Sequence, residues 1–127
     1  MNAEIADASV IAACDFRRTK SGRGPCAPGR GHTVLYEPLL LPFELVSVAR
    51  KKTLEKPEQA GAIRRALALT LGMDMHWADT DFSEVMWLAL ETGLTTYDAV
   101  YLSLARRLGI PLVTFDGRLA AAAETRK

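Results

Sequence analysis

Residues 93–118 constrain the fold more than any other stretch, because they read as a helix followed by a strand. Apolar side chains recur there at helical spacing, which predicts one buried face; they are Tyr97, Val100, Tyr101, Leu104 and Leu108. Thr95 is a suitable N-cap, Gly109 ends the helix, and Pro111 prevents its resumption. The apolar run at residues 110–115 then predicts a strand buried on both faces.

The rest of the chain repeats this alternation of strands and helices. Strands are expected at residues 3–6, 32–36 and 73–77, and helices at residues 8–14, 39–52, 57–71, 82–91 and 117–124. Ser9 is the expected cap of the first helix, and Ala62, Leu67 and Leu71 are the expected buried positions of the helix at 57–71. Strands that alternate with helices predict a parallel sheet covered on both faces.

Length and composition are typical of one globular domain, which we expect to span residues 1–127. The net charge is +1, so any nucleic-acid contact must come from a local basic patch rather than from the whole chain. The spacing of Cys14 and Cys26 fits no metal motif, and we expect free thiols. No apolar run approaches the roughly 20 residues that cross a bilayer. We therefore expect a cytoplasmic protein without a membrane partner.

Four acids are expected at one edge of the sheet. Asp7 and Asp116 follow strands, whereas Glu44 and Asp98 fall in the first turns of helices that begin after strands. Ligands of open parallel sheets bind beyond the carboxyl ends of the strands. Crowded carboxylates repel one another unless protons or a cation compensate them, and oxygen ligands suit Mg²⁺. The pattern favours metal-assisted phosphodiester hydrolysis.

Each acid also has a structural explanation that needs no ligand. Asp98 with Thr95 makes a capping box, and Glu44 satisfies a helix dipole. Asp116 with Gly117 makes a turn. Asp7 is hardest to explain in this way, because an acid that closes an apolar strand costs free energy unless it caps a helix or binds something.

Three parts of the chain resemble the PIN domain, and within it the small VapC-type toxins of bacterial and archaeal toxin–antitoxin pairs. Residues 5–10 look like the family's opening strand with its first acid, and residues 38–48 are similar to its second-acid helix. Residues 94–105 and 111–119 resemble the segments that carry the third and fourth acids. Residues 17–31 depart from the family, which usually has helical sequence there.

The resemblance implies a three-layer α/β/α fold with a central parallel sheet of four to five strands. It matches Asp7, Glu44, Asp98 and Asp116 to the catalytic, metal-binding acids, and Ser9 and Thr114 to supporting hydroxyls. It also implies an endoribonuclease that uses one or two Mg²⁺ or Mn²⁺ ions, and a toxin held in check by an antitoxin protein. Basic residues in the departing segment are candidate RNA contacts; they are Arg17, Arg18, Lys20, Arg23 and Arg30.

Two other functions stay open. A phosphoryl-aspartate protein with Asp7 as acceptor is disfavoured, because Asp-x-Asp is absent at Asp7 and residues 111–116 bring no lysine. A catalytically weak RNA- or protein-binding module would use the acids to hold a structural cation. Residues 82–91 also carry Met86 and Trp87 beside the inward positions, and a two-fold homodimer would bury such a face.

Overall fold

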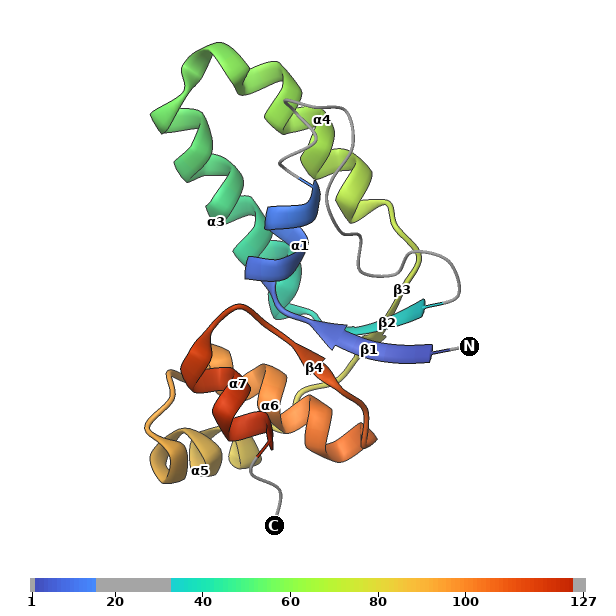
Figure 1. Cartoon of the computed structure of the whole chain (residues 1–127), viewed down its shortest axis with the longest axis vertical. Coiled ribbons are helices and arrows are strands. Elements are labelled where there is room, and N and C mark those ends of the chain that lie inside the picture. Colours follow the sequence, from blue (N-terminus) through green and yellow to red (C-terminus); the bar gives the residue numbers. More distant parts are fainter. Residues whose placement is uncertain (1, 16–32, 125–127) are drawn as a thin grey trace.

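The computed structural model describes residues 2–15 and 33–124, and it has three layers (Figure 1). Four parallel strands form the described sheet, in the order β3-β2-β1-β4. They are β1 (Asn2–Ala6), β2 (Thr33–Pro38), β3 (Met75–Ala78) and β4 (Leu112–Val113). The expected α/β/α fold with a parallel sheet of four to five strands is therefore confirmed for the described part of the chain.

One face of the sheet is covered by α1 (Ala8–Asp15), α3 (Leu40–Glu55) and α4 (Ala60–Leu71), of which α3 and α4 form a projecting hairpin (Figure 1). A short 3₁₀ turn, η1 (Pro57–Gln59), joins the two helices of the hairpin. The other face is covered by α5 (Phe82–Thr92), α6 (Thr96–Leu108) and α7 (Gly117–Glu124).

A hydrophobic core lies on each side of the sheet. Successive side chains of a strand point to opposite faces. In β1, Ile5 packs in the core with α5–α7, whereas Ala6 packs in the core with α1, α3 and α4. This two-sided burial explains why the strands read as apolar runs rather than as alternating patterns.

The helix boundaries follow local capping signals. Thr95 accepts a hydrogen bond from the backbone N–H of Asp98, which confirms it as the N-cap of α6. Gly109 ends α6 in the left-handed conformation at φ 67°, a backbone region that glycine enters without strain. Asp81 caps α5 by accepting from the backbone N–H of Glu84, and Gly93 ends it at φ 78°.

Several expectations about elements are wrong in detail. The α-helix expected from residue 57 begins at Ala60, and its fully buried positions are Ile63, Ala66 and Thr70. Of the three apolar positions expected to face inward, Ala62 is half-buried and Leu67 packs half-buried against the core, but Leu71 is exposed. The strand expected at 110–115 is only Leu112–Val113 and is half-buried, because β4 lies at the edge of the sheet and pairs with β1 alone. Tyr97 and Leu108 of the predicted α6 stripe are exposed.

Two further features concern cysteine and membranes. Cys14 is buried and disulfide-bonded, so the expected free thiol is wrong at this position; the other cysteine lies outside the described residues. Among the described residues, none of the helices has both the length and the apolarity to span a membrane.

Candidate active site

Asp7 lies between β1 and α1, directly after the last residue of the strand and directly before the first residue of the helix. Its side chain is only 6% exposed. Oδ1 accepts hydrogen bonds from Ser9 Oγ at 2.6 Å and from the backbone N–H of Val10 at 3.3 Å, and Oδ2 accepts one from Thr114 Oγ1 at 2.5 Å. Asp7, rather than the expected Ser9, is therefore the N-cap of α1. Such donors offset the cost of burying a carboxylate.

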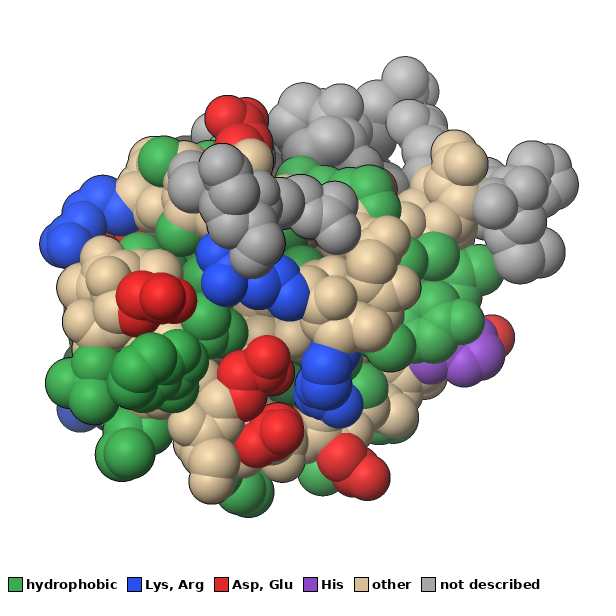
Figure 2. Space-filling model, turned by 90° about the horizontal axis from the view of Figure 1, so that it is seen from below, with side chains coloured by type: hydrophobic (Ala, Val, Ile, Leu, Met, Phe, Trp, Pro, Cys, Tyr) green, Lys and Arg blue, Asp and Glu red, His purple; other side chains and the backbone are tan. Residues whose placement is uncertain are grey.

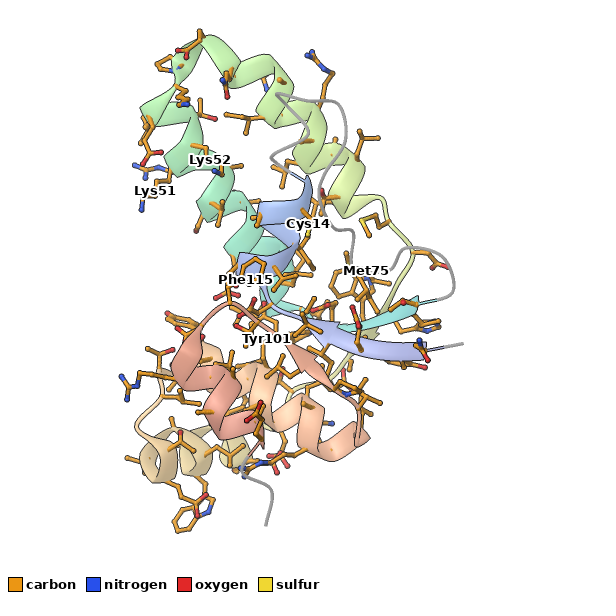
Figure 3. All side chains as sticks on the ribbon, viewed as in Figure 1. Cys14, Lys51, Lys52, Met75, Tyr101 and Phe115 are labelled. Carbon is orange, nitrogen blue, oxygen red and sulfur yellow. The ribbon has the colours of Figure 1, made fainter. Side chains whose placement is uncertain are left out.

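Glu44 approaches Asp7 from α3 and lies just beyond the first turn of that helix, not within it as the sequence predicted, because α3 begins at Leu40. Tyr101, labelled in Figure 3, reaches from α6 to donate its hydroxyl to Glu44 Oε1 at 2.6 Å. Burial raises the pKa of Glu44, the Tyr101 hydrogen bond lowers it, and the negative charges of Asp7 and Asp98 raise it again. Burial and the nearby carboxylates likewise raise the pKa of Tyr101, which keeps the phenol a donor.

Asp98 lies in the first turn of α6 and is half-buried. Burial raises its pKa most, the carboxylates of Asp116 and Asp7 raise it further, and Thr95 and the guanidinium of Arg118 lower it. Arg118 also donates to the backbone oxygen of Gly93 at 3.1 Å, a contact that ties the start of α7 to the turn before α6.

Asp116 is exposed and immediately precedes α7. Its Oδ1 accepts from the backbone N–H of Leu119 at 2.9 Å, and its own N–H donates to Thr114 Oγ1 at 3.0 Å. Thr114 thus touches both Asp7 and Asp116. Ser9 makes a second link between the two segments, because its Oγ accepts from the N–H of Phe115 at 3.4 Å.

The structure brings the four predicted acids to one mouth at the carboxyl ends of the strands. Each of Glu44 and Asp98 is electrostatically coupled to Asp7, and Asp98 is also coupled to Asp116. Among the described residues, however, no three His, Cys, Asp or Glu side chains are grouped closely enough to hold a metal ion as they stand. Each of three of these acids has hydrogen-bond donors of its own: Tyr101 donates to Glu44, Ser9 donates to Asp7, and the backbone N–H of Leu119 donates to Asp116.

This donor set nevertheless fits a hard divalent cation. Carboxylate oxygens are the ligands that Mg²⁺ and Mn²⁺ prefer. Burial raises the pKa of Glu44 and of Asp98 most, and neighbouring carboxylates raise both further; a bound cation would offset that part of the negative charge. The roles of Asp7, Glu44, Asp98 and Asp116 as ligands remain predictions, as do the supporting roles of Ser9 and Thr114.

Sequence reasoning missed two residues near this mouth. Glu37, in β2, is fully buried, and the signal that could have revealed it is the same as for Asp7, an acid near the end of an apolar strand. Tyr101 was predicted only as a buried helix residue, and its hydrogen bond to Glu44 depends on a contact between residues 57 positions apart. The candidate RNA contacts Arg17, Arg18, Lys20, Arg23 and Arg30 lie outside the described residues.

The fold and the mouth together define a class, a small three-layer α/β/α protein with an acidic cluster where parallel strands end. Within that class the chain belongs to the PIN domain family, whose sequence profile matches residues 30–125. The matched region includes Glu44, Asp98 and Asp116, and Asp7 precedes it.

Individual relatives agree with this assignment. The chain is 28% identical over 119 residues to "Ribonuclease VapC3" of Pyrobaculum aerophilum, covering 91% of each sequence. It is similar to the crystal structure of PAE2754 from Pyrobaculum aerophilum, with a TM-score of 0.76, 25% identity, and coverage of 97% of this chain and 81% of that one. A second similar structure is VapC20 of Mycobacterium tuberculosis, a "Sarcin-Ricin loop cleaving toxin", with a TM-score of 0.58, 18% identity, and coverage of 98% and 99%. At that identity the second likeness shows the fold alone.

Proposed function

We propose that this protein is a metal-dependent endoribonuclease. The observation that carries the proposal is the proximity of the four acids: Glu44 and Asp98 each lie close enough to buried Asp7 to feel its charge, Asp98 also feels Asp116, and Thr114 hydrogen-bonds to both Asp7 and Asp116. These acids would hold one or two Mg²⁺ or Mn²⁺ ions, whose chemistry when bound is to orient a phosphodiester and lower the pKa of an attacking water. The name of the relative VapC3, a ribonuclease, supports RNA as the substrate.

The chain's own residues would prepare the site. Ser9 and Thr114 hold both oxygens of Asp7, so that its orientation is set before substrate arrives. Tyr101 holds Glu44 in the same way. Fixing ligand orientation in advance is what makes a weakly bound ion catalytically useful.

Cleavage of RNA with and without Mg²⁺ tests this function. We expect the wild type to cleave RNA in Mg²⁺ and not in EDTA, and both Asp7→Asn and Asp98→Asn to lose cleavage. Asp74→Asn is the matched control, because Asp74 is exposed and precedes β3 at the opposite edge of the sheet. Equal cleavage by the wild type and the two mouth variants would refute the proposal.

A second candidate is a catalytically weak module that holds a structural cation. Calorimetric titration with Mg²⁺ and Mn²⁺ beside the cleavage assay separates the two, because binding without turnover would select the module.

The proposed biological role is that of a cytoplasmic toxin restrained by an antitoxin protein. Its support is the likeness to VapC-type proteins, one of which is titled a toxin. Co-expression with the protein encoded by a small neighbouring gene tests it; the expected result is that this gene relieves growth inhibition by the wild type. Persistent inhibition in the presence of the neighbour's protein would contradict the pairing.

We also propose a homodimer through α5. Phe82, Met86 and Leu90 recur every four residues along the helix, and each is more than half exposed. Figure 2 shows hydrophobic side chains gathered on one side of the face that includes α5–α7. A stripe of this kind on a helix is typical of an interface between copies of a chain.

A further inference from the structure

Burying the carboxyl group of Glu37 costs free energy of folding. Glu37 is fully buried in β2, and its Oε2 accepts a hydrogen bond from the backbone N–H of Ala6 at 3.0 Å. The other oxygen, Oε1, is buried without a hydrogen-bond partner among the described residues. A buried polar atom without a partner lowers stability, so the fold alone does not explain this carboxyl group.

The hydrogen bond between Glu37 and Ala6 lies where β1 and β2 stop pairing. The backbone register of β1 with β2 runs from Asn2–Thr33 to Glu4–Leu35 and stops there. Beyond that point Ile5 and Ala6 pair with β4, while β2 continues beside β3 as far as Pro38 and Ala78. The Glu37 carboxyl lies between the parted strands and takes the amide that a strand carbonyl would otherwise take.

We propose that Glu37 is a positioning residue of the acidic centre: by holding the Ala6 amide between the parted strands, it fixes where β1 ends and thereby where Asp7 presents its carboxylate. Ala6 immediately precedes Asp7, so a shift of the Ala6 peptide moves Asp7 directly. Thr114 and Ser9 hold Asp7 from the β4 and α1 sides, and Glu37 holds the same strand end from the β2 side.

Electrostatics are consistent with a carboxyl group in this position. Burial raises the pKa of Glu37 to about 9, the Ala6 hydrogen bond lowers it, and the charges of Asp7 and Glu4 raise it. A protonated Glu37 adds no negative charge beside Asp7 and still accepts the Ala6 amide through Oε2. Burial raises the pKa of Tyr101 most, and the negative charges of Glu44 and Glu37 are among the further causes.

The inference rests on the proposed metal site, and it is tested by metal binding rather than by cleavage. The affinity for Mn²⁺ is measured by calorimetry for the wild type, Glu37→Leu and Glu37→Gln, with thermal unfolding of each variant alongside. We expect Glu37→Leu to bind Mn²⁺ more weakly by about tenfold or more, the usual cost of removing a group that orients a metal ligand. Glu37→Gln keeps an acceptor for the Ala6 amide and is expected to restore affinity to near the wild-type value.

Thr70→Val is the matched control, because it removes a buried hydroxyl from α4, where Thr70 donates to the backbone oxygen of Ala66. It is expected to change thermal stability without changing Mn²⁺ affinity. Unchanged affinity in Glu37→Leu would overturn the inference and leave the proposed function intact. No Mn²⁺ binding by the wild type would overturn both.

A measurement on the wild type covers the case in which Glu37→Leu does not fold. The backbone amide resonance of Ala6 is followed by NMR while Mg²⁺ is added. Mg²⁺ replaces Mn²⁺ in this experiment because Mn²⁺ is paramagnetic and broadens nearby resonances. We expect it to shift together with the resonances of Asp7 and Val10, because the same strand end responds to the ion. A stationary Ala6 resonance while Asp7 shifts would contradict the positioning role.

Discussion

Asp7 and Asp116 each serve two purposes at once. Asp7 caps α1 and Asp116 caps α7, and both lie at the acidic mouth. The structural explanations that the sequence offered for single acids are therefore compatible with a shared site, because helix N-termini and strand carboxyl ends meet at the same edge of the sheet. A carboxylate has two oxygens, so one residue can cap a helix with one oxygen and still bind a metal ion with the other.

Thr114→Val tests the hydroxyl that links the two strand ends. The substitution removes the donor to Asp7 Oδ2 while keeping the shape of the side chain. We expect Mn²⁺ affinity to fall by about tenfold, since Asp7 would lose one of the groups that orient it. Calorimetry measures the change, and Thr53→Val, whose hydroxyl donates to Ala49 within α3, is expected to bind like the wild type. Equal affinities for all three proteins would exclude a supporting role for Thr114.

The pKa of Glu37 predicts how stability depends on pH without a divalent ion. Its pKa rises from 4.5 to about 9 on folding, so between these values the folded state keeps a proton that the unfolded state has lost. The free energy of unfolding should therefore fall as pH rises, by about 1.4 kcal/mol per pH unit from this group. Stability contributed by the protonated group is fully present below pH 4.5 and is lost toward about pH 9.

Glu37→Gln cannot lose that proton, and its stability should vary less with pH. Urea unfolding in EDTA at several values between pH 5 and pH 8 measures both proteins. The expected result is that the difference in unfolding free energy between variant and wild type grows with pH. Parallel curves would mean that Glu37 is ionised in the folded protein.

Only some of the residues at the acidic mouth could be predicted from the sequence. Asp7, Glu44, Asp98 and Asp116 stand out because acids follow apolar runs or open helices. Glu37 carries a weaker form of the same signal, because it is the next-to-last residue of β2 rather than the residue after the strand, and its exclusion from water depends on where β1 and β2 stop pairing.

At the scale of elements, the helices with strong caps were predicted closely. α6 and α7 begin and end where Thr95, Gly109 and Gly117 indicate. The fully buried positions of the helix at 57–71 were not predicted, because its alanine-rich sequence offers several stripes of similar apolarity, and packing against α3 selects Ile63 and Ala66. Local sequence can fix where a helix ends, but the face that it buries depends on its neighbours.

Two glycine substitutions should change stability in opposite directions. Gly109→Ala forces alanine to φ 67°, and no atom lies within 4 Å of the added Cβ, so the cost is backbone strain of about 1 kcal/mol. Gly61→Ala lies inside α4, where Cβ would meet Arg65 Nη1 at an ordinary 3.5 Å, and should stabilise the protein by about 0.5–1 kcal/mol. Urea unfolding measures both, and a stabilising Gly109→Ala would contradict this account of the α6 C-terminus.

At the scale of the whole molecule, α5 presents an apolar surface that a second copy of the chain could cover. α5 buries Val85 and Leu88 and turns Phe82, Met86 and Leu90 outward. Met86→Glu places a charge on this stripe without touching the core. We expect it to shift the protein from dimer to monomer, as measured by sedimentation velocity over a range of concentrations. Ser83→Glu, on the same helix but off the stripe, is the control, and an unchanged molar mass for Met86→Glu would rule out this interface.

The overall architecture was predictable because alternating strands and helices admit few parallel arrangements. The convergence of distant acids follows from that topology, whereas the hydrogen bonds that individual carboxylates accept, such as that of Glu44 from Tyr101, do not.

The contact between Thr114 and Asp7 joins residues 107 positions apart. During translation Asp7 is made early, and the segment that orients it is made more than a hundred residues later. The two ends of the chain must therefore both be synthesised before the hydrogen bonds around Asp7 can be completed, so that the acidic mouth is one of the last features of the fold to form.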